Sequence, residues 1–283
     1  MEIKSLSKIN FNIIFQAFNH AFADYEVQLN KSQLQTMLKR RGWNSDLSFG
    51  AFDENEIKAF TLNGVGNFNG VTTAYDTGTG TLKDYRGKGL ATRIFEYSIP
   101  YLREMGVKQY LLEVLQHNVK AVSLYKNIGF RITREFSYFI KENEEINNEI
   151  RTSANSYLIR QINIENFNTV TDFWDFYPSW QNSFESIKRA MDDFLCLGVF
   201  AENNLIGYCI FEPISGDITQ IGVDKQNRRK GIASRLLKEI IRLNKNNVVK
   251  ILNTETSCNS ITNFLKSKNI EATGMQFEMI KEI

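Results

Sequence analysis

The feature that most constrains this chain is an internal repeat. Thr81–Ala91 reads TLKDYRGKGLA, and Val223–Ala233, which lies 142 positions later, reads VDKQNRRKGIA. The two segments share two Lys, one Arg, one Gly and one Ala at identical spacing. The residues directly ahead of them, Thr77–Thr81 (TGTGT) and Thr219–Val223 (TQIGV), share a Thr and a Gly. A 283-residue chain with such a repeat is expected to contain two similar folded units.

Both halves show the same order of expected strands and helices. In the first half, the pattern predicts helices at 11–24 and 32–41, strands at 47–52, 57–64 and 71–81, a helix at 89–105, a strand at 109–115, a helix at 118–127 and a last strand or pair at 130–140. In the second half, it predicts a strand at 157–162, helices within 167–184 and 186–193, strands at 196–202, 205–211 and 217–223, a helix at 231–243, a strand at 248–253, a helix at 259–268 and a strand at 275–283. Strands that lead into helices in this way are typical of an α/β fold.

The segment between the halves is polar. Lys141–Asn155 reads KENEEINNEIRTSAN, which lacks aromatic residues and is typical of a linker. We therefore expect an N-terminal domain over 1–143, a linker over 144–155 and a C-terminal domain over 156–283.

Composition argues against several classes of protein. The 34 Lys and Arg nearly balance the 32 Asp and Glu, which disfavours a dedicated nucleic-acid binder. Three cysteines (Cys196, Cys209 and Cys258) without C-x-x-C spacing, and two histidines, disfavour a disulfide framework and a metal site. The chain has no apolar signal segment near Met1 and no stretch typical of a transmembrane helix. We expect a soluble cytoplasmic protein that binds neither nucleic acid nor membrane and holds no metal.

The repeated loop has the chemistry of an anion site. It lies between an expected strand and an expected helix, whose N-terminus presents unpaired N–H groups and a partial positive charge. Gly87 and Gly89 let the backbone approach a phosphate closely, and Arg86 and Lys88 add positive charge. The chain contains no P-loop pattern, and the glycines of 64–70 miss the dinucleotide-binding spacing by one residue.

The loop and the residues that follow it resemble the GCN5-related N-acetyltransferase (GNAT) superfamily. The resemblance rests on YRGKGLA at Tyr85–Ala91, on Asn118 and Ala121, and on LYKNIGF at Leu124–Phe130. It covers 72–139 well and parts of the second half more weakly. It implies two tandem acyl-CoA N-acyltransferase folds, each with a central mixed, partly splayed sheet flanked by helices. It also implies acetyl-CoA, or another acyl-CoA, as the cofactor.

The resemblance assigns cofactor-binding residues in each half. In the first half, the pyrophosphate would lie on Arg86, Gly87, Lys88, Gly89, Leu90, Ala91 and Thr92, the pantetheine arm on the backbone of Thr79, Gly80 and Thr81, and the CoA chain against Asn118. The corresponding residues of the second half are Ile221, Gly222, Val223, Arg228, Arg229, Lys230, Gly231, Ile232, Ala233, Ser234 and Asn259. The second loop either binds CoA as well or is a remnant that supports the fold.

Acyl transfer from a thioester needs a proton donor for the leaving thiolate and a proton acceptor for the amine. The resemblance places Tyr125 at the usual general-acid position, and backbone amides of the splayed strand would stabilise the oxyanion. Asp76, Glu113 and His117 are candidate bases, and the choice among them stays open. Strand alternation predicts that Asp76 shares a face with the two glycines of the TGTGT segment.

The second half departs from the family pattern. Lys266 aligns with Tyr125, and Ile270 and Glu271 replace the Gly-Phe pair, so a routine proton donor is missing there. We therefore expect an N-acetyltransferase whose N-terminal half is catalytic and whose acceptor is a primary amine of a small molecule, peptide or protein. Two alternatives stay open: a non-catalytic acyl-CoA-binding regulatory protein, and an acetyltransferase with its active site in the C-terminal half.

The sequence leaves the acceptor pocket and the assembly state open. The aromatic cluster Phe173, Trp174, Phe176, Tyr177 and Trp180 either lines an acceptor pocket or packs in the core or between the two halves. A monomer and a homodimer are both compatible with two tandem domains.

Overall fold

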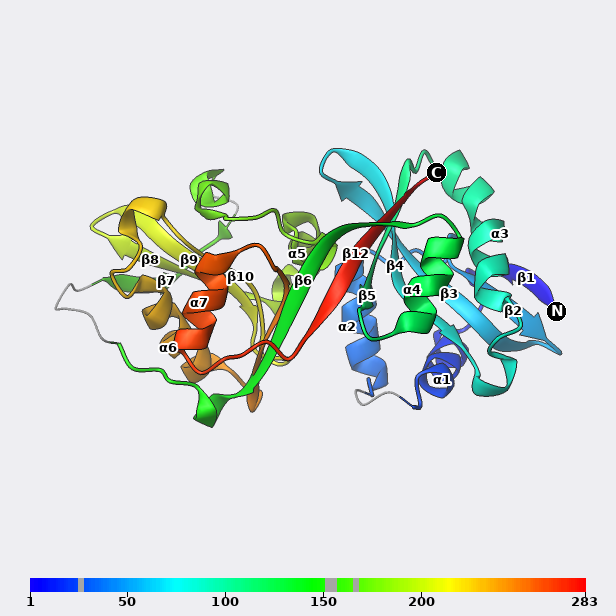
Figure 1. Ribbon diagram of the computed structural model, residues 1–283, viewed down its shortest axis with the longest axis horizontal. Helices are drawn as coiled ribbons and strands as arrows, with labels where there is room; N and C mark the ends of the chain where they lie inside the picture. The colour runs from blue at the N-terminus through cyan, green and yellow to red at the C-terminus, as the bar shows by residue number, and fades with distance from the viewer. Residues whose placement is uncertain (25–27, 151–156, 165–167) are drawn as a thin grey trace. The chain divides into compact units, whose positions relative to one another are not determined.

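The computed structural model describes residues 1–24, 28–150, 157–164 and 168–283 (Figure 1). The chain forms two compact units, and their membership does not follow chain order. Unit 1 comprises Met1–Thr133, Ser183–Ala190 and Phe277–Ile283, and unit 2 comprises Arg134–Asn182 and Met191–Gln276. The domain boundaries at 143 and 156 remain predictions.

Unit 1 is built on a mixed sheet. Its strands β1 (Glu2–Ser5), β2 (Phe49–Asp53), β3 (Glu56–Phe68), β4 (Val71–Thr81) and β5 (Gln109–Leu115) lie in that order. Neighbours from β1 to β4 are antiparallel, whereas β4 and β5 are parallel. The C-terminal strand β12 (Gly274–Glu282) is the next neighbour of β5, and the Ile283 amide donates to the Lys108 carbonyl at 3.0 Å. The last strand of the chain thus joins the unit built mainly from the first half.

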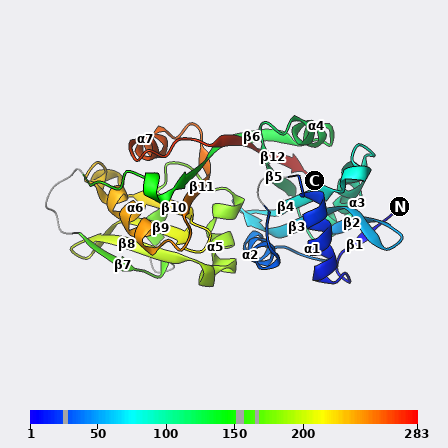
Figure 2. The same cartoon turned by 90° about the horizontal axis from the view of Figure 1, so that it is seen from below.

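Two pairs of helices cover the two faces of this sheet (Figure 2). α1 (Phe11–Ala21) and α2 (Lys31–Arg41) pack on one face, and α3 (Leu90–Glu104) and α4 (Val119–Asn127) pack on the other. The limits of α2 have clear local causes. At the start of α2, the side chains of Asn30 and Gln33 each accept a hydrogen bond from the other residue's backbone amide. At its end, Gly42 adopts the left-handed conformation, with φ of 76°.

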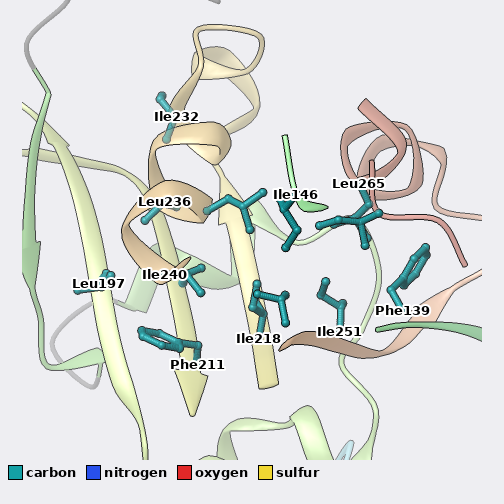
Figure 3. Packing of buried hydrophobic residues seen from close by; sticks show 14 of the residues in the cluster. Phe139, Ile146, Leu197, Phe211, Ile218, Ile232, Leu236, Ile240, Ile251 and Leu265 are labelled. Carbon is teal, nitrogen blue, oxygen red and sulfur yellow. The ribbon is translucent and has the colours of Figure 1, made fainter. Parts of the chain in front are cut away.

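Unit 2 has the same architecture. Its strands lie in the order β6 (Arg131–Glu142), β11 (Val248–Glu255), β10 (Asp217–Val223), β9 (Asn204–Glu212), β8 (Leu195–Ala201) and β7 (Leu158–Gln161). β10 and β11 are parallel, and the other neighbours are antiparallel. α6 (Ile232–Leu243) and α7 (Asn259–Ser267) contribute to a hydrophobic core over this sheet (Figure 3). The remaining helix, α5 (Phe184–Arg189), belongs to unit 1.

The predicted α/β fold with mixed sheets and flanking helices is confirmed, and most predicted elements differ by one to four residues at their ends. The prediction is poorest at 167–184, where the described residues form 3-10 turns at Asn168–Phe173 and Trp180–Asn182 instead of α-helices. Pro178, which lacks an N–H and disfavours a helical conformation of the residue before it, lies between these two turns. No helix in the described part of the chain is both long enough and apolar enough to cross a membrane.

Candidate functional site

β4 and β5 separate partway along their length. Their parallel register ends at Tyr75 and Leu111, while β4 continues from Asp76 to Thr81. In unit 2, the register between β10 and β11 ends at Asp217, which is the equivalent position by the 142-residue repeat. Both units therefore contain a splayed strand pair, and Thr79–Thr81 lies in the separated part of β4.

A bulge at Thr77 interrupts the ladder between β3 and β4. Because one extra residue changes which face the following side chains use, Asp76 and the glycines after the bulge lie on opposite faces. A Cβ at Gly78 would lie 3.5 Å from Phe18 of α1, whereas Asp76 bonds to α4 on the other face. The expected alternation, which placed Asp76 with Gly78 and Gly80, is wrong for this reason.

Asp76 and Tyr125 meet where the two strands begin to separate. The Tyr125 hydroxyl donates to Asp76 Oδ2 at 3.1 Å, and each residue is only 8% exposed. The carboxylate also accepts from the Gly78 amide at 2.9 Å and from Thr79 Oγ1 at 2.8 Å. Burial raises the pKa of Asp76 to about 6, although these hydrogen bonds oppose the shift. The structure thus brings the predicted acid and one candidate base into direct contact.

A second tyrosine and carboxylate pair lies on the opposite face of the sheet. The Tyr75 hydroxyl donates to the Glu113 carboxylate. The guanidinium carbon of Arg41, the last residue of α2, lies 5.9 Å from the centre of the Tyr75 ring, and Arg41 Nη1 donates to the Thr77 carbonyl at 3.1 Å. Burial, reinforced by the Glu113 charge, raises the pKa of Tyr75 well above its ordinary value. Tyr75 was not predicted as a site residue, because the sequence spacing does not reveal which side chain it contacts.

The loop after β4 has the backbone expected of an anion cradle. A 3-10 turn at Lys83–Tyr85 leads into Gly87 and Gly89, whose φ angles of 75° and 71° favour glycine. A Cβ at either glycine would meet no atom within 4 Å, so this side of the loop is open. Gly89 is the N-cap of α3 and has no side chain that could accept hydrogen bonds from the first amides of the helix. No capping side chain therefore competes with an anion for the amides of Leu90–Thr92.

Arg86 makes three contacts within unit 1, and its predicted contact with the pyrophosphate stays a prediction. Its Nε donates to the Thr81 carbonyl at 3.2 Å, its Nη2 to the Ala21 carbonyl at 2.9 Å, and its Nη1 contacts Asp24 at 3.1 Å. These contacts tie the end of β4 to the end of α1. Lys88 is exposed, with its Nζ 4.6 Å from the ring centre of a neighbouring tyrosine, and is therefore the better placed cation for a phosphate.

Asn118 and His117 lie at the start of α4. Asn118 Oδ1 caps the helix by accepting from the Ala121 amide at 3.2 Å, while His117 is exposed. The contact predicted between Asn118 and the CoA chain stays a prediction.

The second loop repeats this geometry in unit 2. A 3-10 turn at Lys225–Asn227 precedes Arg229 and Gly231, whose φ angles are 62° and 81°. Arg228 Nε donates to the Val223 carbonyl at 3.3 Å, as its counterpart in unit 1 does to a carbonyl five residues earlier. Local backbone structure is thus retained in both copies of the repeat, and ligand binding by residues 228–234 stays a prediction.

The chemistry at the splayed strands is not retained. At the end of α4, the backbone carbonyl of Tyr125 accepts from the Phe130 amide. At the end of α7, the backbone carbonyl of Leu265 accepts from the Ile270 amide in the same way. The predicted alignment of Tyr125 with Lys266 is therefore wrong by one residue, because the two halves differ in length before this helix. The same shift places Cys258, the N-cap of α7, in the position of Asn118, whereas the predicted Asn259 is the first helical residue.

Unit 2 has aliphatic residues where unit 1 has its polar pair. Ile218 follows the last β10–β11 pair as Asp76 follows the last β4–β5 pair, and it belongs with Leu265 to one buried core (Figure 3). Ile218 is 2% exposed and Leu265 is 1% exposed. Neither side chain can donate or accept a proton.

Hydrogen bonds within unit 2 also bridge its splayed strands. The Trp174 indole donates to the Tyr208 hydroxyl at 2.6 Å, and that hydroxyl donates to Gln220 Oε1 of β10 at 2.7 Å. Gln220 Nε2 donates to the Asn182 carbonyl at 2.6 Å, and Asn182 Nδ2 donates to the Leu252 carbonyl of β11 at 2.9 Å. Trp180 is 1% exposed, so part of the aromatic cluster packs in the interior of unit 2, as one of the two expectations held.

Comparisons with known proteins agree with this architecture. The chain is 33% identical over 60 residues to N-alpha-acetyltransferase 30 of Schizosaccharomyces pombe and 28% identical over 97 residues to the uncharacterized N-acetyltransferase YobR of Bacillus subtilis. These matches cover 21% and 33% of the chain, and only 40% and 36% of the two relatives.

Solved structures match the fold over nearly the whole chain. A GCN5-related N-acetyltransferase from Sphaerobacter thermophilus has a TM-score of 0.73 at 14% identity, covering 99% of this chain and 95% of its own. A tandem GNAT protein from the clavulanic acid biosynthesis pathway has a TM-score of 0.73 at 10% identity, covering 99% and 98%. At these identities the likeness concerns the fold alone.

The family itself follows from the sequence match. The model of the acetyltransferase (GNAT) family matches residues 13–130 and again residues 159–262, so each copy of the repeat is matched separately. With the splayed strands and the glycine loop present in both units, the chain belongs to the GNAT acetyltransferase family.

Proposed function

We propose that the chain transfers the acetyl group of acetyl-CoA directly to a primary amine, and that unit 1 holds the active site. The acceptor is an amine of a small molecule, a peptide or a protein. The observation that carries the proposal is the Asp76–Tyr125 pair, which lies where β4 leaves β5, on the strand that leads into the glycine loop.

The residues of unit 1 fit an acyl-CoA. The open glycine loop and the amides of Leu90, Ala91 and Thr92 suit a pyrophosphate, and the separated backbone of Thr79–Thr81 suits an extended pantetheine arm. Acetyl-CoA, when bound, supplies the thioester whose acetyl group is transferred. Holding donor and acceptor side by side at this opening would supply much of the rate acceleration.

Asp76 and Tyr125 have distinct roles in this proposal. Tyr125 holds a proton at the opening and gives it to the thiolate as the carbon–sulfur bond breaks. Asp76 fixes the orientation of that hydroxyl through the 3.1 Å hydrogen bond, and the Gly78 amide and Thr79 hydroxyl hold Asp76 in turn. Asp76 thus acts as a positioning residue rather than as the base.

Unit 2 supports the fold and does not take up the pantetheine arm. Ile218 and Leu265 replace the polar pair there, and Asn182 connects Gln220 of β10 to Leu252 of β11 across the separated strands. This interpretation explains why unit 2 keeps the backbone of the glycine loop although its core has no proton donor at the splayed strands.

Thiol release from acetyl-CoA tests the proposal directly. The purified chain would be assayed against spermidine, glucosamine, tyramine and a peptide with a free N-terminus. We expect acetyl transfer to at least one of these amines and a loss of about 100-fold or more in Tyr125→Phe. Binding of acetyl-CoA without transfer to any amine would contradict the proposal and favour a non-catalytic acyl-CoA-binding protein.

A further inference from the structure

A cavity of about 310 Å³ lies in unit 1 between α3, the end of α4 and β12. Its lining residues all belong to unit 1, and neither Asp76 nor Tyr125 nor the glycine loop is among the described residues that line it. Sites that bind small molecules have volumes of about 300–1,000 Å³, so this cavity is large enough for a small ligand. It is therefore a candidate site separate from the opening between β4 and β5.

One wall of the cavity is aromatic. The rings of Phe95, Tyr110 and Phe130 line it and lie 5.2 to 5.9 Å from one another, centre to centre. Ile99 of α3 adds aliphatic surface beside them. Aromatic side chains pack favourably edge-to-face or offset against another ring, so this wall fits a ligand with an aromatic group.

The cation that lines the cavity is Lys281 of β12. It is partly buried, and its Nζ donates to the Ile128 carbonyl at 2.5 Å. An ammonium has three N–H donors, and among the described residues no carboxylate lies within ion-pair distance of this one. Lys281 thus fits an anionic ligand group such as a carboxylate, with which it would form a charge-assisted hydrogen bond.

The anion that lines the cavity is Glu96 of α3. It forms no ion pair with any residue that the structure describes, Lys281 included. Pro100, four residues later in the same helix, has no N–H, so the backbone carbonyl of Glu96 lacks its usual helical donor. Residue 96 therefore offers two acceptors, a carboxylate and a carbonyl, to a ligand ammonium.

We propose that this cavity binds a free aromatic α-amino acid. The ligand carboxylate accepts from Lys281, its ammonium donates to Glu96, and its ring packs against Phe95, Tyr110 and Phe130. A cation and an anion that line one cavity without pairing with each other call for both charges of a zwitterion. An aromatic acid or an aromatic amine would satisfy only one of them.

The aromatic wall is also the support of the proposed acid. The rings of Phe95 and Phe130 lie 5.9 and 5.7 Å from the ring centre of Tyr125. A bound amino acid thus contacts the side chains that hold Tyr125, although it lies outside the acetyl-transfer site.

Isothermal titration calorimetry of the full chain with L-phenylalanine tests this site in the absence of acetyl-CoA. We expect one bound molecule per chain. We expect binding about 10-fold weaker or less for 3-phenylpropionate, which lacks the ammonium, and for phenethylamine, which lacks the carboxylate. Equal affinity for L-phenylalanine and either analogue would overturn the proposal, as would the absence of binding at millimolar L-phenylalanine.

Two charge variants assign the binding to the cavity. Lys281→Gln and Glu96→Gln should each weaken L-phenylalanine binding about 10-fold or more. The matched controls Lys126→Gln and Glu104→Gln remove charges of the same sign from exposed residues of α4 and α3 that do not line the cavity, and should leave the affinity unchanged. Unchanged affinity in either cavity variant would overturn the inference. A chain that binds L-phenylalanine as expected but acetylates no amine would overturn only the proposed function.

Discussion

The Tyr125 hydroxyl donates to Asp76 Oδ2 at 3.1 Å and so joins α4 to β4 at the first residue beyond the last β4–β5 pair. At the equivalent place in unit 2, the aliphatic residues Ile218 and Leu265 lie in one hydrophobic core. The two copies of the fold therefore differ at the position where proton transfer would occur.

Removing the Tyr125 hydroxyl should impair chemistry more than binding. Tyr125→Phe keeps the ring that packs against Phe95 and Phe130, so we expect the variant to fold and to bind acetyl-CoA as the wild type does. Its kcat should fall by about 100-fold or more, since the leaving thiolate loses its proton donor. Single-turnover kinetics with saturating acetyl-CoA measure this effect, and an unchanged rate would show that another group supplies the proton.

The buried Asp76 should make stability depend on pH. Its pKa is raised from 3.8 to about 6 by burial, so its ionisation opposes folding as pH rises through 6. The penalty disappears only well below pH 4, where the group is protonated in both states. Relative to wild type, Asp76→Asn should therefore gain about 2.5 kcal/mol in unfolding free energy between pH 4 and pH 8. Denaturant titrations at both pH values measure the gain, and a difference that does not change with pH would contradict it.

The bridge in unit 2 should matter for stability and not for catalysis. Tyr208→Phe leaves the Trp174 indole and the Gln220 side chain without the hydroxyl that joins them, which should cost about 1–3 kcal/mol of unfolding free energy. The acetyl-transfer rate per folded molecule should stay at the wild-type value. If the acetyl-transfer rate of folded Tyr208→Phe fell as far as that of Tyr125→Phe, unit 2 would take part in the reaction, which would contradict this prediction.

Substitutions of Arg86 and Lys88 should have different effects on thermal stability and on the affinity for CoA. Arg86→Lys cannot reproduce the three contacts to Thr81, Ala21 and Asp24, so we expect a lower melting temperature even without CoA. Lys88→Ala removes an exposed cation beside the open loop and should weaken CoA binding several-fold with an unchanged melting temperature. Equal effects of both variants on melting and on affinity would contradict this division.

Sequence patterns predicted much of the fold, because its regular elements have local causes. The repeat, the alternating strands and the positions of Gly87 and Gly89 are visible without a structure, and β4, β5 and β10 have the predicted bounds. The bulge at Thr77 was not predictable from alternation, since a bulge is the position where alternation fails.

The site was harder to predict, because its partners come from distant segments. The family resemblance places Tyr125 near the thioester, yet its contact with Asp76 spans 49 residues and depends on that bulge. The Tyr75–Glu113 pair depends on how β4 and β5 lie side by side in the sheet. Neither composition nor spacing indicated that most of β12, at the end of the chain, would belong to unit 1.

The most direct test of the account counts acetyl-CoA molecules per chain by native mass spectrometry in matched loop variants. Gly89→Asp and Gly231→Asp each introduce a negative side chain at a left-handed position that starts a helix, α3 in one case and α6 in the other. We expect one acetyl-CoA per chain in the wild type, none in Gly89→Asp and one in Gly231→Asp. Two molecules per wild-type chain, or binding lost in Gly231→Asp and kept in Gly89→Asp, would contradict it.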